Sequence, residues 1–174
     1  MNNFFRHLFV RLLARNGHTT VIDTRSTEQV NSVFIIFPEN EEDVKNSVSI
    51  ITDLVARKKK ITVLIHGEFV RLIPNSYALM IKEYFPKDKL FGEIPKQNIK
   101  NLINSQEADL LLNLNRNDEI FTLLCTSLVS APVKFGFRKE FSDRFFNLQF
   151  ASNSSDSYNS FSNFKSYLYK LIKL

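Results

Sequence analysis

The stretch VFIIF at residues 33–37, followed by PENEED at residues 38–43, decides the fold of this chain. Five apolar residues in succession are typical of a strand buried on both faces, and Pro38 ends the run. An acidic loop then leads into residues 44–55, where apolar side chains recur at helical spacing. A buried strand, a short loop and an amphipathic helix predict the first unit of a parallel α/β sheet.

The same alternation continues along the chain. Further apolar runs predict strands at residues 61–65, 78–85, 108–114, 133–137 and 145–150. Helical spacing of apolar residues predicts helices at residues 68–74, 95–104, 119–130 and 161–172, and the Ser/Asn-rich residues 151–160 are expected to form a loop. The predicted fold class is α/β, a three-layer Rossmann-like domain with a mostly parallel sheet of about five strands.

Length and composition indicate one globular domain with a sizeable core. The chain has 174 residues, of which 44% are hydrophobic, and no composition shift marks a second domain. We expect an N-terminal basic amphipathic helix at residues 1–17 and a single Rossmann-like domain at residues 18–174.

The N-terminal segment has a distinctive two-sided pattern. Apolar residues that include Phe4 and Phe9 share one face, while Arg6, Arg11 and Arg15 lie on the other without any acidic residue. A helix of this kind can lie in a membrane interface and attract anionic lipid. The alternative is that its apolar face packs on the domain or on a partner chain.

Several classes of site are excluded by what the sequence lacks. It has four glycines and no glycine-rich phosphate-binding motif after a strand, so no dinucleotide or P-loop cofactor site is expected. The single Cys125 lies in an apolar helical pattern and predicts a buried thiol, and the three histidines lack the spacing of metal ligands. We therefore expect neither cofactor nor metal.

The charge and the absence of targeting signals narrow the partners. The formal charge of +5 permits an anionic partner, but lysines and aromatic residues fall on opposite faces of the predicted helices, which argues against nucleic acid. The N-terminus is a poor signal peptide and no apolar run is long enough to cross a bilayer. A cytoplasmic protein, peripheral at the inner membrane if the N-terminal helix binds lipid, is the expectation.

The ends of the predicted strands supply the first candidate site residues. In open parallel sheets ligands bind at the carboxyl ends of the strands. The acidic loop before residue 44 and His66, which ends the strand at residues 61–65, therefore face the same edge. Acidic residues in the first turn also suit the positive end of a helix dipole, and a histidine that ends a strand is often a turn residue, so a structural role remains open for both.

The order of elements resembles the N-terminal half of family 9 glycosyltransferases, the ADP-heptose:lipopolysaccharide heptosyltransferases. Residues 34–36 are similar to that family's first strand, and Glu42-Asp43-Val44 falls where the family has Gly-Asp-Val. Residues 108–114 and 130–137 are similar to its later strands, so the resemblance spans roughly residues 4–137. Residues 87–137 are also similar to small uncharacterised bacterial proteins of this length.

The resemblance implies a GT-B half-domain with a site on the acceptor side. The family's proposed general base toward the acceptor hydroxyl corresponds to Asp43, and His66 and Asn115 would then line the acceptor cleft. Glu42 replaces the family's glycine, and Phe37 replaces a basic residue. The half of the family's fold that holds the nucleotide sugar has no counterpart in this sequence. A degenerate, free-standing domain that is inactive alone is therefore expected.

Three functional hypotheses follow from the sequence. The first is a heptosyltransferase-like domain that takes a lipid-linked or saccharide acceptor, with a partner chain supplying the donor-binding half. The second is a non-catalytic binding or scaffold domain, docked on the inner membrane by its N-terminal helix. The third is a small-ligand binder of flavodoxin-like form that uses the same strand ends.

Overall fold

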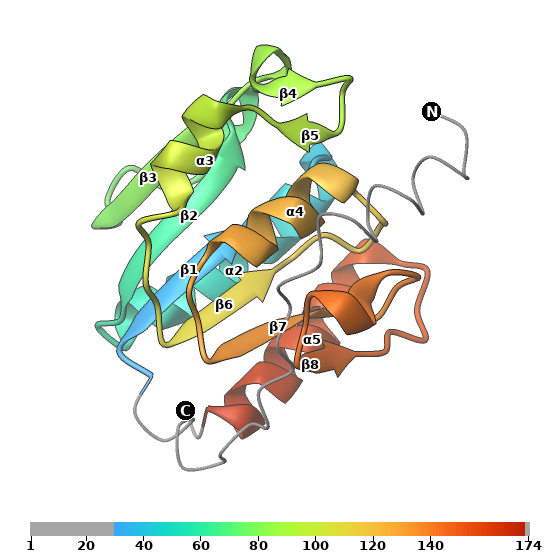
Figure 1. The fold of residues 1–174 in the computed structure, drawn as a ribbon. Helices are drawn as coiled ribbons and strands as arrows, with labels where there is room; N and C mark the ends of the chain where they lie inside the picture. The colour runs from blue at the N-terminus through green and yellow to red at the C-terminus, as the bar shows by residue number, and fades with distance from the viewer. Residues whose placement is uncertain (1–29, 173–174) are drawn as a thin grey trace.

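The computed structural model describes residues 30–172, so the predicted N-terminal helix lies outside the described residues. Six parallel strands form the central sheet in the order β3-β2-β1-β6-β7-β8 (Figure 1). Their bounds are Ser32–Ile36 (β1), Lys60–His66 (β2), Leu79–Tyr84 (β3), Leu110–Asn113 (β6), Val133–Phe137 (β7) and Leu148–Phe150 (β8). The α/β class is confirmed, and the sheet has six strands where about five were expected.

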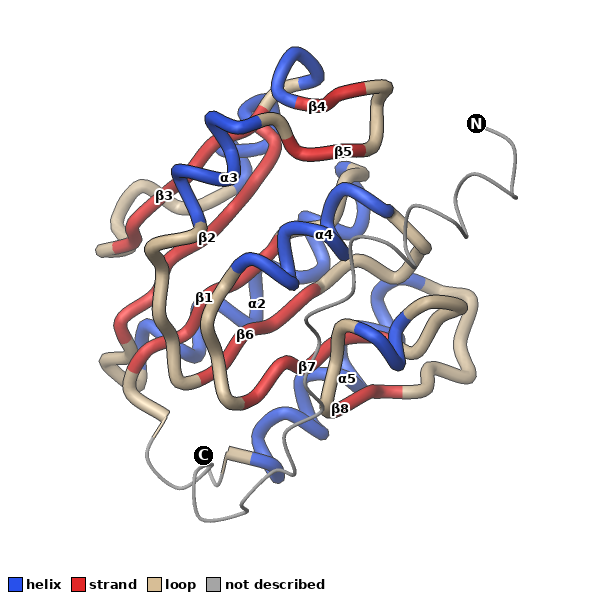
Figure 2. Tube along the Cα trace, viewed as in Figure 1, coloured by secondary structure: helices blue, strands red, loops and turns tan. Residues whose placement is uncertain are grey.

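Helices cover both faces of the sheet, as a three-layer domain requires. The helix α2 (Glu41–Ala56) and the helix α5 (Ser157–Leu171) lie on one face, while α3 (Gln97–Ile103) and α4 (Ile120–Leu128) lie on the other (Figures 1 and 2). Short 3-10 turns occupy Gly67–Leu72, Pro86–Asp88 and Ser142–Arg144, and a small hairpin pairs β4 (Lys89–Leu90) with β5 (Ile94–Pro95). Among residues 30–172, no helix is long and apolar enough to cross a bilayer.

The buried run at residues 33–37 explains this layering directly. Side chains alternate across a strand. Ile35 therefore joins the core under α2 and α5, whereas Phe34 and Ile36 join the core under α3 and α4. All five side chains of the run are essentially inaccessible to solvent. The predicted buried thiol of Cys125 lies in the second of these cores, where burial raises its pKa and keeps it protonated.

Two sequence expectations about local structure are corrected. Residues 151–160 were expected to be loop throughout, but α5 already begins at Ser157, capped by the Asp156 carboxylate, which accepts from Asn159 N at 2.7 Å. Asp is a strong N-cap residue, and this signal outweighs the low apolar content of the first turn. The predicted helix at residues 68–74 is instead a 3-10 turn.

The amino ends of the two central strands are fastened by one carboxylate. Asp109 Oδ2 accepts from the backbone N of Asn31 and of Ser32, and from the Ser32 hydroxyl, at 2.8–2.9 Å. Burial raises the pKa of Asp109, but these hydrogen bonds outweigh it and the pKa lies below its ordinary value. The strands β1 and β6 are thereby held in register from the start of both.

A glycine in β7 provides a sharp test of the packing. A Cβ on Gly136 would lie 2.7 Å from Cζ of Phe146, a buried ring in the cluster beside α4. We expect Gly136→Ala to lower the free energy of unfolding by about 1–3 kcal/mol through overpacking, measured by urea denaturation. Phe146→Leu replaces the ring by a smaller side chain, so the double variant should recover part of this loss in the free energy of unfolding. A double variant that loses the full sum of the two single effects would contradict the assigned contact.

Candidate functional site

The candidate site lies at the carboxyl edge of the sheet, where loops from all six parallel strands come together. Successive connections run outward to β2 and β3 on one side of β1, and to β7 and β8 on the other side of β6. The crossover direction therefore reverses between β1 and β6. In open α/β sheets a crevice for ligands forms outside such a reversal.

In this protein the side chain of Asn115 fills that crevice. Its Nδ2 donates to the carbonyl of Phe37 at 2.9 Å, and its Oδ1 accepts from the backbone N of Glu39 at 3.1 Å. Both ends of the amide thus join the loop after β6 to the loop after β1. Asn115 is 2% exposed, so the structure places it as a bridge between two loops and not on an open surface.

Asp43 lies in the first turn of α2, as the sequence predicts, but its carboxylate is buried. The residue is 1% exposed, and Asn40 Nδ2 donates to Oδ2 at 2.9 Å while the Ser157 hydroxyl donates to Oδ1 at 2.5 Å. Arg116 Nε lies 3.0 Å from Oδ1 and 3.2 Å from Oδ2, and its Nη2 lies 3.0 Å from Oδ1. Each carboxylate oxygen therefore accepts at least two hydrogen bonds from the protein.

Arg116 connects this carboxylate to the C-terminal part of the chain. Its Nη1 donates to the carbonyl of Ser155 at 3.0 Å, just before α5. Ser157, which donates to Asp43, itself accepts from Asn46 Nδ2 at 2.9 Å. We call Asp43, Arg116 and Ser157 the carboxylate cluster. It fastens α2, the loop after β6 and the start of α5 to one another.

His66 ends β2, as expected, and is packed among aromatic rings. The ring centroids of Phe69, Tyr84 and Phe85 lie 5.4–6.0 Å from that of His66. Its Nδ1 lies 3.9 Å from Glu68 Oε2, too far for a hydrogen bond. Within residues 30–172, no hydrogen bond or ion pair joins His66 to Asp43 or Asn115. The three sequence-predicted residues therefore share one edge, but only Asp43 and Asn115 belong to one network. Asn115 bonds the loop after β1, and the neighbouring Arg116 bonds Asp43 in α2.

A second ion pair at this edge was missed by the sequence reasoning. Lys89 Nζ lies 2.6 and 2.7 Å from the two carboxylate oxygens of Glu39, and Glu39 Oε1 also accepts from Tyr84 Oη at 3.1 Å. The ammonium lies 4.7 Å from the ring centroid of Phe121. Burial, and then the Glu39 charge, raise the pKa of Tyr84 well above its ordinary value, so Tyr84 stays protonated. This contact joins the loop after β1 to the end of β3 and to β4.

Lys139, which follows β7, was also missed. Its Nζ donates to the carbonyls of Asn115 at 2.8 Å and Asn117 at 2.9 Å, on either side of Arg116. Burial lowers the pKa of Lys139 to about 8, although the carboxylates of Asp118 and Glu119 favour the charged form. The ammonium therefore holds the loop that presents Arg116 to Asp43.

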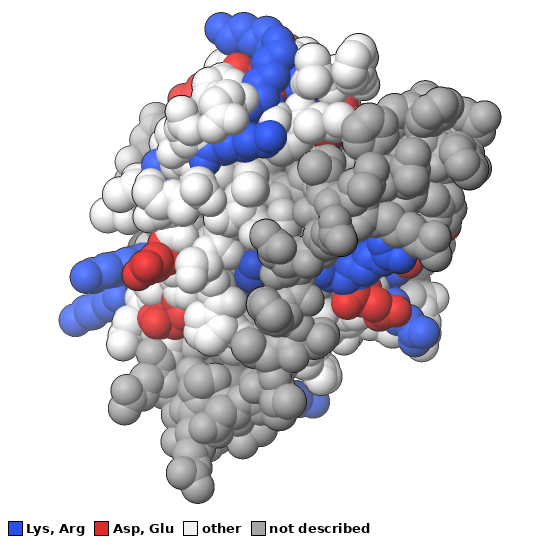
Figure 3. Space-filling model, viewed as in Figure 1, with Lys and Arg blue, Asp and Glu red and all other residues white. Residues whose placement is uncertain are grey.

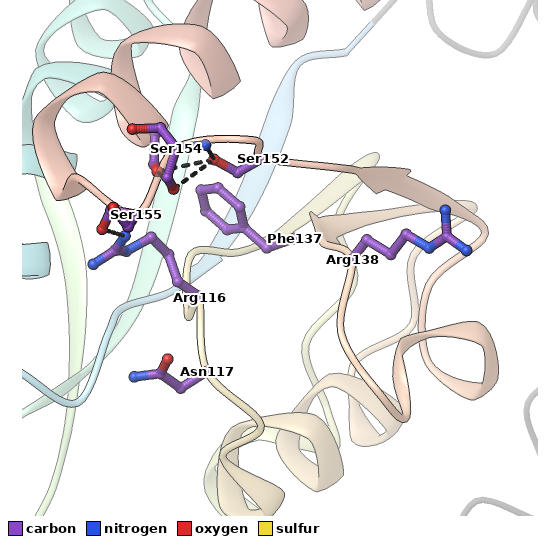
Figure 4. Close-up of a pocket in the computed structure, with 8 residues that line it drawn as sticks. Arg116, Asn117, Phe137, Arg138, Ser152, Ser154 and Ser155 are labelled. Carbon is purple, nitrogen blue, oxygen red and sulfur yellow. Dashed lines mark hydrogen bonds between the residues drawn. The ribbon is translucent and has the colours of Figure 1, made fainter.

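An open cavity of about 320 Å³ lies next to the carboxylate cluster. It is lined by Arg116, Asn117, Phe137, Arg138, Ser152, Ser154, Ser155 and Ser160 (Figure 4). The hydroxyls of Ser152 and Ser160 lie 2.9 Å apart, and Ser160 also donates to the carbonyl of Ser154 at 3.0 Å.

The cavity lining is suited to binding and poorly suited to acid–base chemistry. It offers hydroxyl, amide and guanidinium groups but no carboxylate or imidazole. Such groups can hydrogen-bond a polar ligand, whereas proton transfer needs a titratable side chain within reach. Among the described residues, no group of three or more His, Cys, Asp or Glu side chains is placed to hold a metal ion.

The fold is that of an α/β Rossmann-like domain, and it is similar to part of the chain in solved glycosyltransferases. Two structures of Escherichia coli heptosyltransferase WaaC are similar to the chain, one with ADP (TM-score 0.55) and one with ADP-2-deoxy-2-fluoro heptose (TM-score 0.59), each at 14% identity. A family 9 glycosyltransferase from Veillonella parvula is similar at 13% identity with a TM-score of 0.59. These likenesses cover 80%, 82% and 84% of this chain respectively.

The likeness covers 46%, 48% and 42% of those three proteins, so this chain spans less than half of their length. At such low identity the likeness shows the fold alone. No curated protein matches the sequence. The model of DUF6913, described as a family of unknown function, matches residues 3–171, and the chain belongs to this family.

The lowered pKa of Lys139 gives a pH-dependent prediction. Because the folded-state pKa of about 8 lies below the ordinary value of 10.5, the unfolded chain binds more protons between these pH values. Lys139 should therefore make the free energy of unfolding rise as the pH increases from about 8 to about 10.5. NMR of ¹³Cε-labelled lysines should show one signal that titrates near pH 8 and is missing in Lys139→Met. The exposed Lys170 serves as control, since Lys170→Met should leave that signal in place; its disappearance there would contradict the assignment.

Proposed function

We propose that this chain is a glycosyltransferase-like domain that binds a saccharide or another polar ligand at its carboxyl edge and does not transfer sugar by itself. The proposal rests on one observation above all, the state of the Asp43 carboxylate. A general base must have a lone pair directed at the hydroxyl that it deprotonates. Asp43 is buried, and Arg116, Ser157 and Asn40 already occupy its oxygens.

The adjacent cavity supports the binding part of the proposal. It opens beside Arg116 at the edge where parallel α/β sheets bind ligands, and its serine and asparagine groups match the hydroxyls of a sugar. Arg138 is exposed at this cavity, and it adds a positive charge that would favour an acidic sugar over a neutral one.

A second candidate is one half of a two-chain enzyme, in which another chain supplies the donor-binding half. The structural likeness to less than half of each of the three glycosyltransferases favours this arrangement. In that case the acceptor would be a lipid-linked or free saccharide and His66 would lie on the acceptor side, while the buried Asn115 would hold the loops that line it. Docking of Phe4, Arg6, Phe9, Arg11 and Arg15 on an anionic membrane is compatible with either candidate.

Replacement of Asp43 separates the structural from the catalytic role. Asp43→Asn removes the buried charge that Arg116 faces, so it should lower the free energy of unfolding by about 3 kcal/mol, measured by urea denaturation. Glu42→Gln changes the exposed neighbouring carboxylate and is the matched control, with an effect within about 0.5 kcal/mol. In a double-mutant cycle with Arg116→Gln, the losses should be strongly non-additive.

A sugar-transfer assay can contradict the proposal. The test compares sugar transfer from ADP-heptose by the wild type and by Asp43→Asn. Each is assayed alone and with a candidate donor-binding partner. If Asp43→Asn keeps the wild-type stability but abolishes transfer, Asp43 is the base and the non-catalytic proposal fails. If the wild-type chain transfers sugar by itself, the proposal fails regardless of the variant.

Ligand binding at the cavity predicts a charge-dependent preference. Saturation-transfer NMR should detect binding of a uronic acid more strongly than binding of the matching neutral hexose. Arg138→Glu should weaken uronic acid binding by about tenfold, the effect of losing one charge-assisted contact. Arg144→Glu reverses an exposed arginine that does not line the cavity, and it should leave binding unchanged. Equal effects of the two reversals would place the ligand elsewhere.

A further inference from the structure

The hairpin of β4 and β5 lies at the top of the fold (Figure 1). Two of its apolar side chains are exposed to solvent. Phe91 is 78% exposed and Leu90 is 44% exposed, although both are large hydrophobic residues. Phe91 has a φ of 51° and Gly92 a φ of 74°. The left-handed region is costly for a phenylalanine, and such backbone conformations concentrate at binding and switch regions.

The base of this hairpin is held firmly, so the exposed tip is a fixed feature of the fold. Asp88 accepts from the backbone N of Phe85 at 2.9 Å and from Asn98 Nδ2 at 2.6 Å, and its carbonyl accepts from Lys96 N at 2.9 Å. Lys89, the first residue of β4, forms the ion pair with Glu39. These contacts fasten the hairpin to the turn before it, to α3 and to the loop after β1.

The exposed charge beside the tip is mainly positive. Lys87 and Lys96 are exposed on either side of the hairpin, and Lys or Arg side chains lie at the top of Figure 3 beside smaller patches of acidic atoms. The acidic residues of the segment are turned inward, since Asp88 is buried and Glu93 is partly buried. The tip thus combines a small apolar projection with flanking positive charge.

We propose that this hairpin tip inserts into the interface of an anionic lipid bilayer, with Phe91 and Leu90 among the lipid headgroups and acyl chains and the two lysines beside acidic headgroups. A specific protein interface usually buries at least ~1,200 Å² in total, far more than two side chains can supply. Membrane binding instead grows with each buried apolar side chain and each lysine near an anionic surface. The inference depends neither on the proposed function nor on the N-terminal helix.

The absence of tryptophan from the chain allows a site-specific test. In Phe91→Trp, the single indole should shift its emission to the blue and be quenched by brominated lipid when vesicles of phosphatidylcholine with phosphatidylglycerol are added. Vesicles of phosphatidylcholine alone should give little change. Tyr158→Trp is the matched control, because Tyr158 is 68% exposed at the start of α5, away from the hairpin. Its emission should not respond to either vesicle.

Further variants measure the contribution of the apolar tip and that of the flanking lysines separately, by lipid titration. Phe91→Ser should weaken partitioning onto anionic vesicles by about tenfold, the effect of withdrawing one aromatic side chain. Lys87→Glu with Lys96→Glu should weaken it by at least about tenfold, whereas Lys170→Glu, on an exposed face of α5, should have a much smaller effect.

Each of the remaining outcomes would overturn the proposal. If the full chain sediments with anionic vesicles while the indole at position 91 stays water-exposed, another surface binds the membrane. A blue shift without vesicles that grows with protein concentration would show that a second copy of the chain covers the tip. An equal response to neutral and anionic vesicles would remove the role of the lysines.

Discussion

The buried contact between Asp43 and Arg116 is the interaction on which the functional edge of this domain depends. Parallel strands by themselves only place loops at a common edge; they do not fix the loops relative to one another. The carboxylate cluster does so by joining α2, the loop after β6 and the start of α5, which are more than a hundred residues apart in sequence at the extremes. Lys139 holds the same loop by donating to two of its backbone carbonyls. Asn115, within that loop, bonds the loop after β1.

In this arrangement, the open part of the edge is not the crevice between β1 and β6, where open α/β sheets usually bind ligands. The crevice between β1 and β6 is closed by Asn115, and the ion pair of Glu39 with Lys89 joins the loop after β1 to β4. The open cavity lies instead toward β7 and the start of α5, behind Arg116. At the open part of the edge, the groups accessible to a ligand are therefore serines, an asparagine and arginines, while the Asp43 carboxylate is buried.

The sequence predicts the elements well and their contacts poorly, for a physical reason. Apolar runs and helical spacing report burial, which is decided locally, so residues 33–37 and Cys125 were correctly assigned to the core. The partners of Glu39 and Lys139 lie 50 and 24 residues away, and no local pattern distinguishes these lysines from exposed ones. Ser157 illustrates the same limit, because its place in α5 depends on the Asp156 cap and its bond to Asp43 depends on tertiary packing. Sequence reasoning could therefore place Asp43 at the edge, but it could not predict that Arg116 would bond to the Asp43 carboxylate.

The free-energy cost of separating Arg116 from the Asp43 carboxylate limits the ability of Asp43 to act as a base. Withdrawing Arg116 from a buried carboxylate costs on the order of 3 kcal/mol, since the desolvated charge loses its partner. At about 1.4 kcal/mol per factor of ten, a state with Asp43 free to act as a base would hold roughly one molecule in a hundred or fewer. A ligand or partner could populate that state only by binding it correspondingly more tightly than the closed state. An anionic group that competes for Arg116 has the required chemistry, because it would supply the guanidinium with a new partner while releasing the carboxylate.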